Sequence, residues 1–210
     1  SHGSLTIGLD AQQPEWDFPV TAEARAFVEQ TVPADKRLLL ISPCSSHPAR
    51  NWRAERYAAV ADYAAQQHSM TVVLSGGPSA TEVAIGSAIE SAMQTRPINL
   101  IGKDTLPQLV ALLSRADLVI SPDSGPAHLA NALATPVIGL HASTWSRRSG
   151  PYGSLDLCVD KFAEAAQKFR GVKPEDLRWG TRIANEGVMD LVEVDEVIER
   201  LDFAIERLPR

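Results

Sequence analysis

The most informative stretch of this chain runs Asp117-Leu-Val-Ile-Ser-Pro-Asp-Ser-Gly-Pro-Ala-His-Leu-Ala-Asn-Ala-Leu-Ala-Thr-Pro-Val-Ile-Gly-Leu140. Its pattern predicts a buried strand, a tight polar turn, a short helix and a second buried strand. Asp123 or Ser124 is suited to cap the helix, and Pro126 fits the first helical position, where no backbone N–H is needed. Gly125 would let a ligand approach the backbone. Free N–H groups and the positive end of the helix dipole indicate an anion site there, commonly one for phosphate, although an ordinary capped loop has the same residues.

Composition is that of an ordinary globular protein with one large core. The chain has 210 residues, of which 44% are hydrophobic and 22% are charged. Its net charge of −6 argues against nucleic acid as the main partner, because such a partner favours a basic surface. No apolar run approaches the roughly 20 residues that a transmembrane helix needs, and no signal peptide is visible. We therefore expect a cytoplasmic protein without a transmembrane segment.

Cysteine usage and metal-ligand spacing give no sign of a metal centre. The two cysteines, Cys44 and Cys158, make no disulfide framework, and there is no Cys-x-x-Cys pair for zinc. No His/Asp/Glu cluster has ligand spacing, and no Asp-x-Asp motif indicates a divalent cation. We expect neither a metal nor a cofactor. The opening Ser1-His2-Gly3-Ser4 is typical of a cloning scar, so we expect the chain to be part of a longer protein.

Short apolar runs alternate with helical periodicity from Leu38 onward. Most runs are rich in Val, Ile and Leu and are bounded by Gly, Pro or Ser, which predicts buried strands. The predicted strands are Leu38–Ser42, Thr71–Ser75, Ile98–Ile101, Asp117–Ser121 and Pro136–Leu140. Apolar stripes within Tyr57–Ala65 and Leu106–Leu113 predict amphipathic helices between them. Together these predict an α/β fold with a doubly wound parallel sheet of Rossmann-like type.

The flanking segments are simpler. We expect residues 5–37 to form a linker and a leading helix near Thr21–Gln30, and residues 38–210 to form one Rossmann-like domain. Residues 141–190 look irregular. The apolar face from Val194 to Leu208 predicts a C-terminal helix.

Small and polar residues gather where the predicted strands end. In a parallel sheet of this type, ligands bind outside the carboxyl ends of the strands. Four loops should meet there: Ser42–Arg50, Ser75–Pro78, Gly102–Asp104 and Asp123–Pro126. Any one of them has the composition of an ordinary loop. Their common position predicts a binding site at this edge.

The order and spacing of four motifs resemble glycosyltransferase family 9, the ADP-heptose:lipopolysaccharide heptosyltransferases. The motifs are Ser42–Trp52, Ser75–Pro78, Asp123–His128 and Arg147–Gly153. The resemblance covers roughly Leu38 to Leu208 and matches the C-terminal half of that family. It implies the GT-B architecture, in which two Rossmann-like domains face each other across a cleft. The C-terminal domain of that pair holds most of the nucleotide sugar.

The resemblance implies roles for residues at the phosphate end of the donor. Ser45 and Ser46 would give hydroxyls to the diphosphate, and Ser124 and Gly125 would meet it at the helix N-terminus. Arg50 takes the place of a family lysine that holds the same phosphates. A planar guanidinium binds phosphate as a fork, whereas an ammonium acts as a point charge.

Further roles follow for the sugar and the base. Asp123 would accept hydrogen bonds from sugar hydroxyls, and His128 would steady the loop or touch phosphate. The backbone of the loop that contains Lys103, Asp104 and Thr105 would recognise the edge of the adenine ring. The family has a carboxylate that binds the ribose hydroxyls, and this sequence has no direct match for it. Pro78 or Ser79 occupies its place, and Glu82 is the candidate substitute.

The resemblance thus implies the donor-binding domain of a metal-independent, inverting transferase. A heptose-like sugar would pass from an ADP-sugar to a lipopolysaccharide core or other glycan acceptor. The family base is an Asp on the N-terminal acceptor domain, which these 210 residues lack, so the catalytic residue is unknown and the isolated chain is expected to be inactive. The intact enzyme would be peripheral at the inner face of the cytoplasmic membrane. Two alternatives stay open: another GT-B enzyme, such as a UDP-sugar transferase or a nucleotide-sugar epimerase, or a non-catalytic nucleotide-binding module.

Overall fold

Six parallel strands form one sheet at the centre of the molecule. The computed structural model describes residues 18–208; the predicted cloning scar and residues 5–17 of the predicted linker lie outside this range. The strand order is β3-β2-β1-β4-β5-β6, and every pair is parallel. The strands are β1 (Leu38–Ile41), β2 (Thr71–Leu74), β3 (Ile98–Asn99), β4 (Leu118–Pro122), β5 (Val137–His141) and β6 (Val159–Asp160). This order is that of a doubly wound Rossmann-type sheet, which confirms the predicted fold class.

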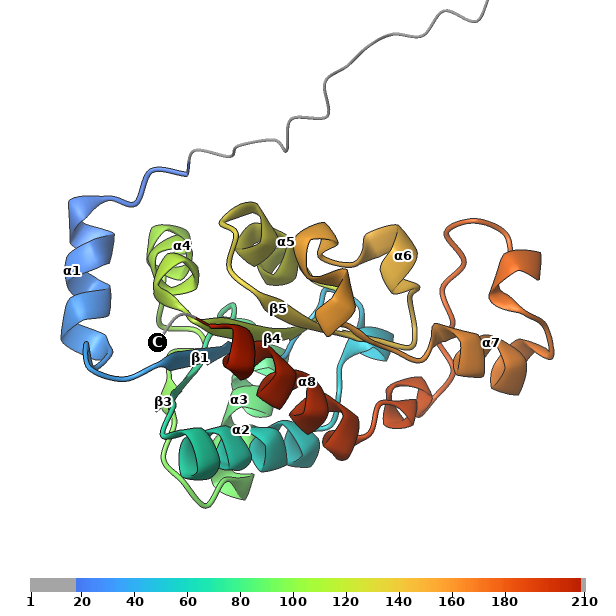
Figure 1. Cartoon of the computed structure of the whole chain (residues 1–210), viewed down its shortest axis with the longest axis horizontal. Coiled ribbons are helices and arrows are strands. Elements are labelled where there is room, and N and C mark those ends of the chain that lie inside the picture. The colour runs from blue at the N-terminus through green and yellow to red at the C-terminus, as the bar shows by residue number, and fades with distance from the viewer. Residues whose placement is uncertain (1–17, 209–210) are drawn as a thin grey trace, which may run out of the picture.

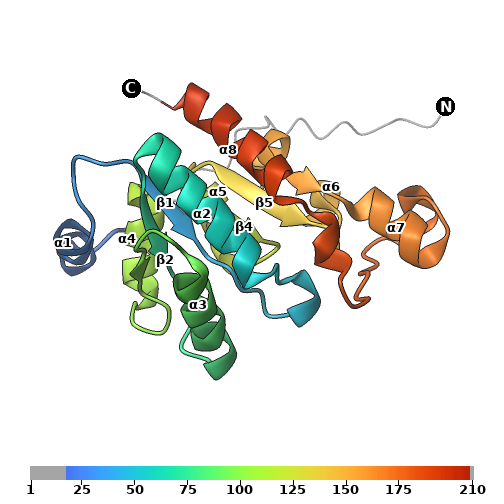
Figure 2. The same cartoon turned by 90° about the horizontal axis from the view of Figure 1, so that it is seen from below.

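Helices cover both faces of the sheet, as Figure 1 shows. On one face lie α1 (Ala22–Thr31), α4 (Leu106–Arg115) and α5 (Gly125–Ala132). On the other lie α2 (Ala54–His68), α3 (Ala80–Ala92) and α8 (Val194–Arg207), which come to the front in Figure 2. Strand β1 is buried on both sides: Leu38 and Leu40 pack on the first face, and Leu39 and Ile41 on the second. Burial on both faces explains why the strands read as continuous apolar runs.

Local sequence signals set the helix ends. Thr21 caps α1 by accepting a hydrogen bond from the Ala24 N–H at 3.2 Å, so the predicted leading helix begins within one residue of its expected place. Ser79 caps α3 in the same way through the N–H of Glu82. Helix α2 ends at Ser69, which has a left-handed conformation with φ of 53°.

Residues 141–190 contain more regular structure than the sequence indicated. Besides α6 (Ser146–Ser149) and the 3₁₀ turns, this region forms β6 and α7 (Phe162–Arg170). The prediction of an irregular segment was therefore wrong there. Strand β6 has only two residues, too few to show a period. Helix α7 buries Phe162, Ala165 and Ala166 on one face of only nine residues, and the left-handed Gly171 follows its last residue.

The C-terminal segment is tied to the loop after β1. The indole N–H of Trp52 donates to the carbonyl of Val192 at 3.0 Å. Arg56 pairs with Glu193, and Arg53 pairs with Asp190 in the 3₁₀ turn Val188–Leu191. These contacts place the end of the chain beside the strand-end loops. None of the helices within residues 18–208 is long and apolar enough to cross a membrane.

Candidate functional site

The loops that follow β1 to β4 meet at the carboxyl edge of the sheet, as predicted. The Ser45 hydroxyl, after β1, donates to the backbone carbonyl of Asp123, after β4, at 2.8 Å. The Ser75 hydroxyl, after β2, donates to the Asp104 carboxylate, after β3, at 2.6 Å. The edge therefore divides into a half around Asp123 and a half around Asp104.

Asp123 is the centre of the first half. It is 5% exposed, and its carboxylate accepts a hydrogen bond from the Ser149 hydroxyl at 2.9 Å. The Arg50 guanidinium lies 3.6 Å from one carboxylate oxygen, and the His128 imidazole lies 3.5 Å from the other. Arg50 also donates to the Asp123 backbone carbonyl at 3.0 Å. One buried carboxylate thus holds together residues from three separate segments.

The charge of Asp123 is stabilised by these neighbours. Burial by itself would raise the pKa of this carboxyl group. Hydrogen bonds from His128, Ser149 and Thr144, together with the positive charge of Arg50, outweigh burial and hold the pKa of Asp123 well below its usual range. Asp123 is therefore ionised at every physiological pH.

The N-terminus of α5 is capped and open. The Ser124 hydroxyl accepts from the Ala127 N–H at 3.4 Å and shares a 2.7 Å hydrogen bond with the Ser121 hydroxyl. A Cβ atom placed on Gly125 would have no atom within 4 Å, so the space in front of the helix is free. Free space, backbone N–H groups and the helix dipole together suit an anion.

Arg50 is a cation in an unfavourable environment. Burial lowers the pKa of its guanidinium, Asp123 opposes this effect, and Arg182 and Arg148 lower the pKa further. Its Nε atom is buried without a hydrogen-bond partner among residues 18–208. Because arginine stays protonated in proteins, an anion bound here would relieve both the desolvation and the repulsion between the guanidinium groups.

The second half of the edge is built around the glycine-rich turn. The Glu82 carboxylate folds back onto this turn and accepts from the Gly77 N–H at 2.6 Å. Burial and the nearby charge of Glu82 together raise the pKa of the Cys44 thiol to about 12, and the same two causes raise the pKa of Asp104. Burial raises the pKa of Asp104, against the hydrogen bond from Ser75. Glu82 is thus held against the glycine-rich turn rather than on an outer helix face.

The remaining predicted site residues lie farther from the Asp123 cluster. Lys103 is exposed and donates to the Asn99 carbonyl at 2.9 Å. Thr105 stands at the start of α4, where its N–H donates to the Gln108 side chain at 2.9 Å. Ser46 is exposed on the loop after β1. The structure brings six of the predicted residues together around the open end of α5: Ser45, Arg50, Asp123, Ser124, Gly125 and His128. Three others, Lys103, Asp104 and Thr105, lie in the half of the edge around Asp104.

Four further residues at this edge were not among the predicted site residues. Thr144 and Ser149 bind Asp123 from the segment after β5, and Arg148 and Arg182 surround Arg50. The sequence motif Arg147–Gly153 was a signal for two of them. Arg182 comes from a loop more than a hundred residues beyond Arg50, and nothing local marks it.

The fold and the site together define a Rossmann-like protein with a candidate anion site at the ends of its strands. Comparison with known families then gives the class. The model of glycosyltransferase family 9 (heptosyltransferase) matches residues 3–177 of this chain. The chain belongs to this family.

Individual relatives agree with this assignment. The chain is 38% identical over 195 residues to the lipopolysaccharide core heptosyltransferase OpsX of Haemophilus influenzae, covering 93% of this chain and 56% of that protein. The structure of ADP-heptose lipopolysaccharide heptosyltransferase II of Escherichia coli is similar with a TM-score of 0.69 at 21% identity, covering 93% of this chain and 56% of that one. The E. coli heptosyltransferase WaaC with ADP gives a TM-score of 0.61 at 17% identity, covering 94% and 52%. The chain spans about half the length of the relatives it matches.

Proposed function

We propose that this chain is the donor-binding domain of a heptosyltransferase that uses an ADP-sugar and acts on a lipopolysaccharide core acceptor. The observation that carries the proposal is the open space in front of α5, where a Cβ atom on Gly125 would meet no atom within 4 Å and the desolvated Arg50 lies beside Asp123. Membership of the heptosyltransferase family and the similarity to a heptosyltransferase solved with ADP support this ligand.

The diphosphate of the donor would lie between α5 and the loop after β1. Its oxygens would accept hydrogen bonds from the backbone N–H groups at Gly125, from Ser46 and from the guanidinium of Arg50. The Ser45 hydroxyl already donates to the Asp123 carbonyl at 2.8 Å, so its part is to fix the loop as well as to line the site. Asp123 would hold Arg50 and His128 in place and face the sugar hydroxyls.

The nucleoside would extend along the second half of the edge. We propose Glu82 as the group that binds the ribose hydroxyls, because its carboxylate lies against Gly77 and close enough to Cys44 and Asp104 to raise the pKa of both. The backbone of the loop Gly102–Thr105 would contact the adenine. A carboxylate held at a glycine-rich strand end is the usual partner of a ribose in Rossmann-type sites.

The reaction would be a displacement at the anomeric carbon. The acceptor oxygen forms a bond to that carbon while the bond to the diphosphate oxygen breaks, and the acceptor proton passes to a carboxylate base on the acceptor domain. Negative charge grows on the departing ADP. Arg50 and the N-terminus of α5 stabilise it at the position where it develops.

Calorimetric titration of the 210-residue chain with ADP, UDP and GDP tests this proposal. We expect ADP to bind at least about tenfold more tightly than UDP or GDP, since the adenine contacts are specific to one base. Preference for UDP would favour a UDP-sugar transferase or an epimerase instead. Absence of binding by all three nucleotides would contradict a donor site on this chain.

A further inference from the structure

The loop after β1, which carries Arg50, is held at both of its ends by buried aromatic residues. The Tyr57 hydroxyl donates to the carbonyl of Pro43, at the start of the loop, at 3.3 Å. Trp52 follows the loop, and its ring packs edge to face on Tyr57 with centroids 5.1 Å apart. Both rings are buried. Because side chains in a close-packed core have little freedom to move, the two ends of the loop are fixed.

Hydrogen bonds within the loop transmit this restraint to Arg50. The side-chain carbonyl of Asn51 accepts from the Ser45 N–H at 2.8 Å and closes the loop. The Arg50 N–H donates to the His47 carbonyl at 3.0 Å and completes the 3₁₀ turn Pro48–Arg50. The place from which the Arg50 side chain leaves the backbone therefore depends on how the end of the loop is held.

A single backbone carbonyl, that of Val192, fastens the end of the loop to the C-terminal segment. It accepts from the Trp52 indole N–H at 3.0 Å and also from the Arg56 guanidinium. Arg56 donates in addition to the Asp190 carbonyl at 2.9 Å. The 3₁₀ turn that precedes Val192 lies against the turn that carries Arg50. The two turns are thus joined by direct packing and by hydrogen bonds.

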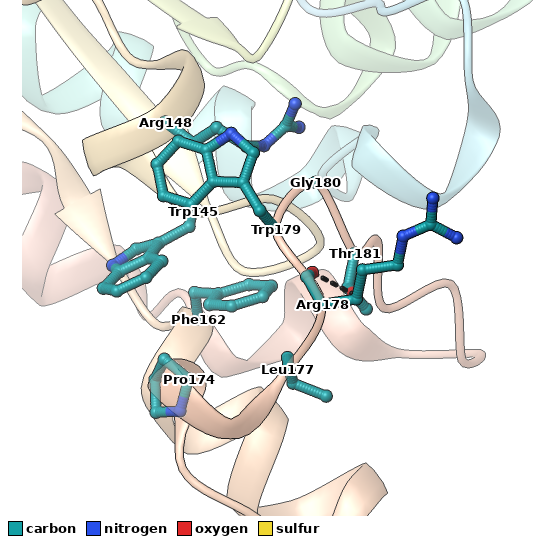
Figure 3. A pocket seen from close by; sticks show the side chains of 9 residues that line it. All are labelled: Trp145, Arg148, Phe162, Pro174, Leu177, Arg178, Trp179, Gly180 and Thr181. Atoms are coloured by element: carbon teal, nitrogen blue, oxygen red, sulfur yellow. Dashed lines mark hydrogen bonds between the residues drawn. The ribbon is translucent and has the colours of Figure 1, made fainter.

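The C-terminal segment is itself fixed, so it can act as a support for the loop. Beyond α7 the Thr181 hydroxyl donates to the Arg178 carbonyl at 2.6 Å and closes a tight turn, as Figure 3 shows. The Ile183 N–H then donates to the Ser143 carbonyl, after β5, at 2.9 Å. Ile183 and Val192 are both fully buried, so the segment between them is anchored in the core at its two ends.

We propose that Trp52 and Arg56 are positioning residues, which hold Arg50 at the phosphate site by fastening its loop to the Val192 carbonyl. A binding group needs such support because small displacements cost affinity. The nature of the ligand rests on the proposed function. The support lies 140 residues beyond Trp52 and after residue 177, where the match to the family model ends. The ion pair of Arg53 contributes less, because that side chain is 62% exposed and solvent screens its charge.

The side-chain N–H signal of Arg50 tests the positioning without any ligand. Its Nε atom is buried and has no hydrogen-bond partner among residues 18–208, so its proton exchanges slowly and reports its surroundings. In the ¹⁵N-labelled chain, Arg50→Ala identifies this signal by its loss. Trp52→Phe removes the indole N–H but keeps a ring against Tyr57, and it should shift or broaden the Arg50 signal.

Tyr63→Phe is the matched control. It removes a hydrogen bond of 3.0 Å from Tyr63 to Asp202, which also ties α2 to the C-terminal part of the chain but lies farther along the helix. The variant should therefore leave the Arg50 signal unchanged. Arg56→Met keeps the aliphatic part of the side chain and removes its donors. It should move the Arg50 signal, and it tests the proposal even if Trp52→Phe fails to fold.

Calorimetry with ADP measures the consequence for binding. Trp52→Phe should weaken ADP about three- to tenfold, and Tyr63→Phe should leave its affinity unchanged. In the Arg50→Ala background, Trp52→Phe should have no further effect, because the phosphate contact through which it acts is gone. A general loss of stability would not produce this dependence on Arg50.

Three results would overturn the proposal: an Arg50 signal that stays in place in both Trp52→Phe and Arg56→Met, an equal movement in Tyr63→Phe, or the same loss of ADP affinity with and without Arg50. If the wild type does not bind ADP although Trp52→Phe moves the Arg50 signal, the proposed donor site is contradicted and the positioning of Arg50 stands. Binding of ADP with an unmoved Arg50 signal would do the reverse.

Discussion

Asp123 organises the candidate site through its own buried charge. A carboxylate that is 5% exposed is costly unless its oxygens are paired, and here four side chains stabilise the ionised form. Its pKa is lower in the folded chain than in the unfolded one. The resulting stabilisation is complete above the unfolded pKa of about 3.9 and is lost as the pH falls through the folded pKa.

Asp123→Asn should therefore destabilise the protein in a pH-dependent way. At pH 7 we expect a loss of about 1–3 kcal/mol in the free energy of unfolding, because hydrogen bonds to a charged group are lost. The difference from the wild type should be constant between about pH 7 and pH 5 and shrink by on the order of 1 kcal/mol by about pH 3. Urea unfolding of both proteins across this range measures it. A difference that stays constant to pH 3 would mean that the pKa of Asp123 is not lowered.

Arg50 carries most of the proposed phosphate affinity. Arg50→Ala should weaken ADP about 10- to 100-fold, because charge-assisted hydrogen bonds are lost from a desolvated position. Arg50→Lys, which restores the residue that the family resemblance places here, should keep most of the affinity. Arg53→Ala removes an exposed arginine that pairs with Asp190 and should leave ADP binding unchanged. Calorimetry compares the three, and equal ADP binding by Arg50→Ala and wild type would exclude Arg50 from the site.

The N-terminus of α5 is the element that would offer the proposed anion site. Gly125 has free space around it and a φ that is not positive, so a side chain there strains nothing in the fold. Gly125→Val should leave the melting temperature within a few degrees of the wild type and weaken ADP by about tenfold or more, because the side chain fills the phosphate position.

Ala163→Val is the matched control for this element, since Ala163 is exposed in the first turn of α7. Calorimetry and thermal unfolding of both variants separate an effect on binding from an effect on folding. If Gly125→Val leaves the ADP affinity unchanged, the ligand does not lie in front of α5.

Continuous burial made the strands predictable to within one or two residues. Leu38–Ile41 is apolar throughout and Val137–His141 is buried throughout, because helices cover both faces, and parallel pairing then brings the strand-end loops together. The two-residue β6 and the alanine-rich α7 gave no such signal. Thr144 and Arg182 reach the site through tertiary packing, which a local pattern does not encode.

The whole molecule presents one candidate functional edge, at the carboxyl ends of its strands. The Asp123 cluster and the glycine-rich turn form the proposed donor side of this edge. The chain spans about half the length of its heptosyltransferase relatives. Binding and transfer are thus expected to separate: this chain would hold the donor, and the acceptor domain would supply the base.

The 210-residue chain should accordingly bind ADP-heptose without transferring its sugar. Release of ADP in the presence of a lipopolysaccharide core acceptor measures transfer, and we expect a rate no higher than that of a protein-free blank. OpsX of H. influenzae serves as the positive control for the substrates. Sustained transfer by this chain alone would contradict the assignment of the base to another domain.

The most direct test of the donor site is a titration of the ¹⁵N-labelled chain with ADP, followed by amide NMR. We predict that the largest shifts fall on Gly125, Ala127 and Ser46, around the open end of α5, with a second group at Gly77 and Gly102. The same amides should stay unmoved in Arg50→Ala at equal ADP concentration. Shifts confined to other parts of the chain would contradict the proposed site, because ADP would then bind away from the ends of β1 and β4.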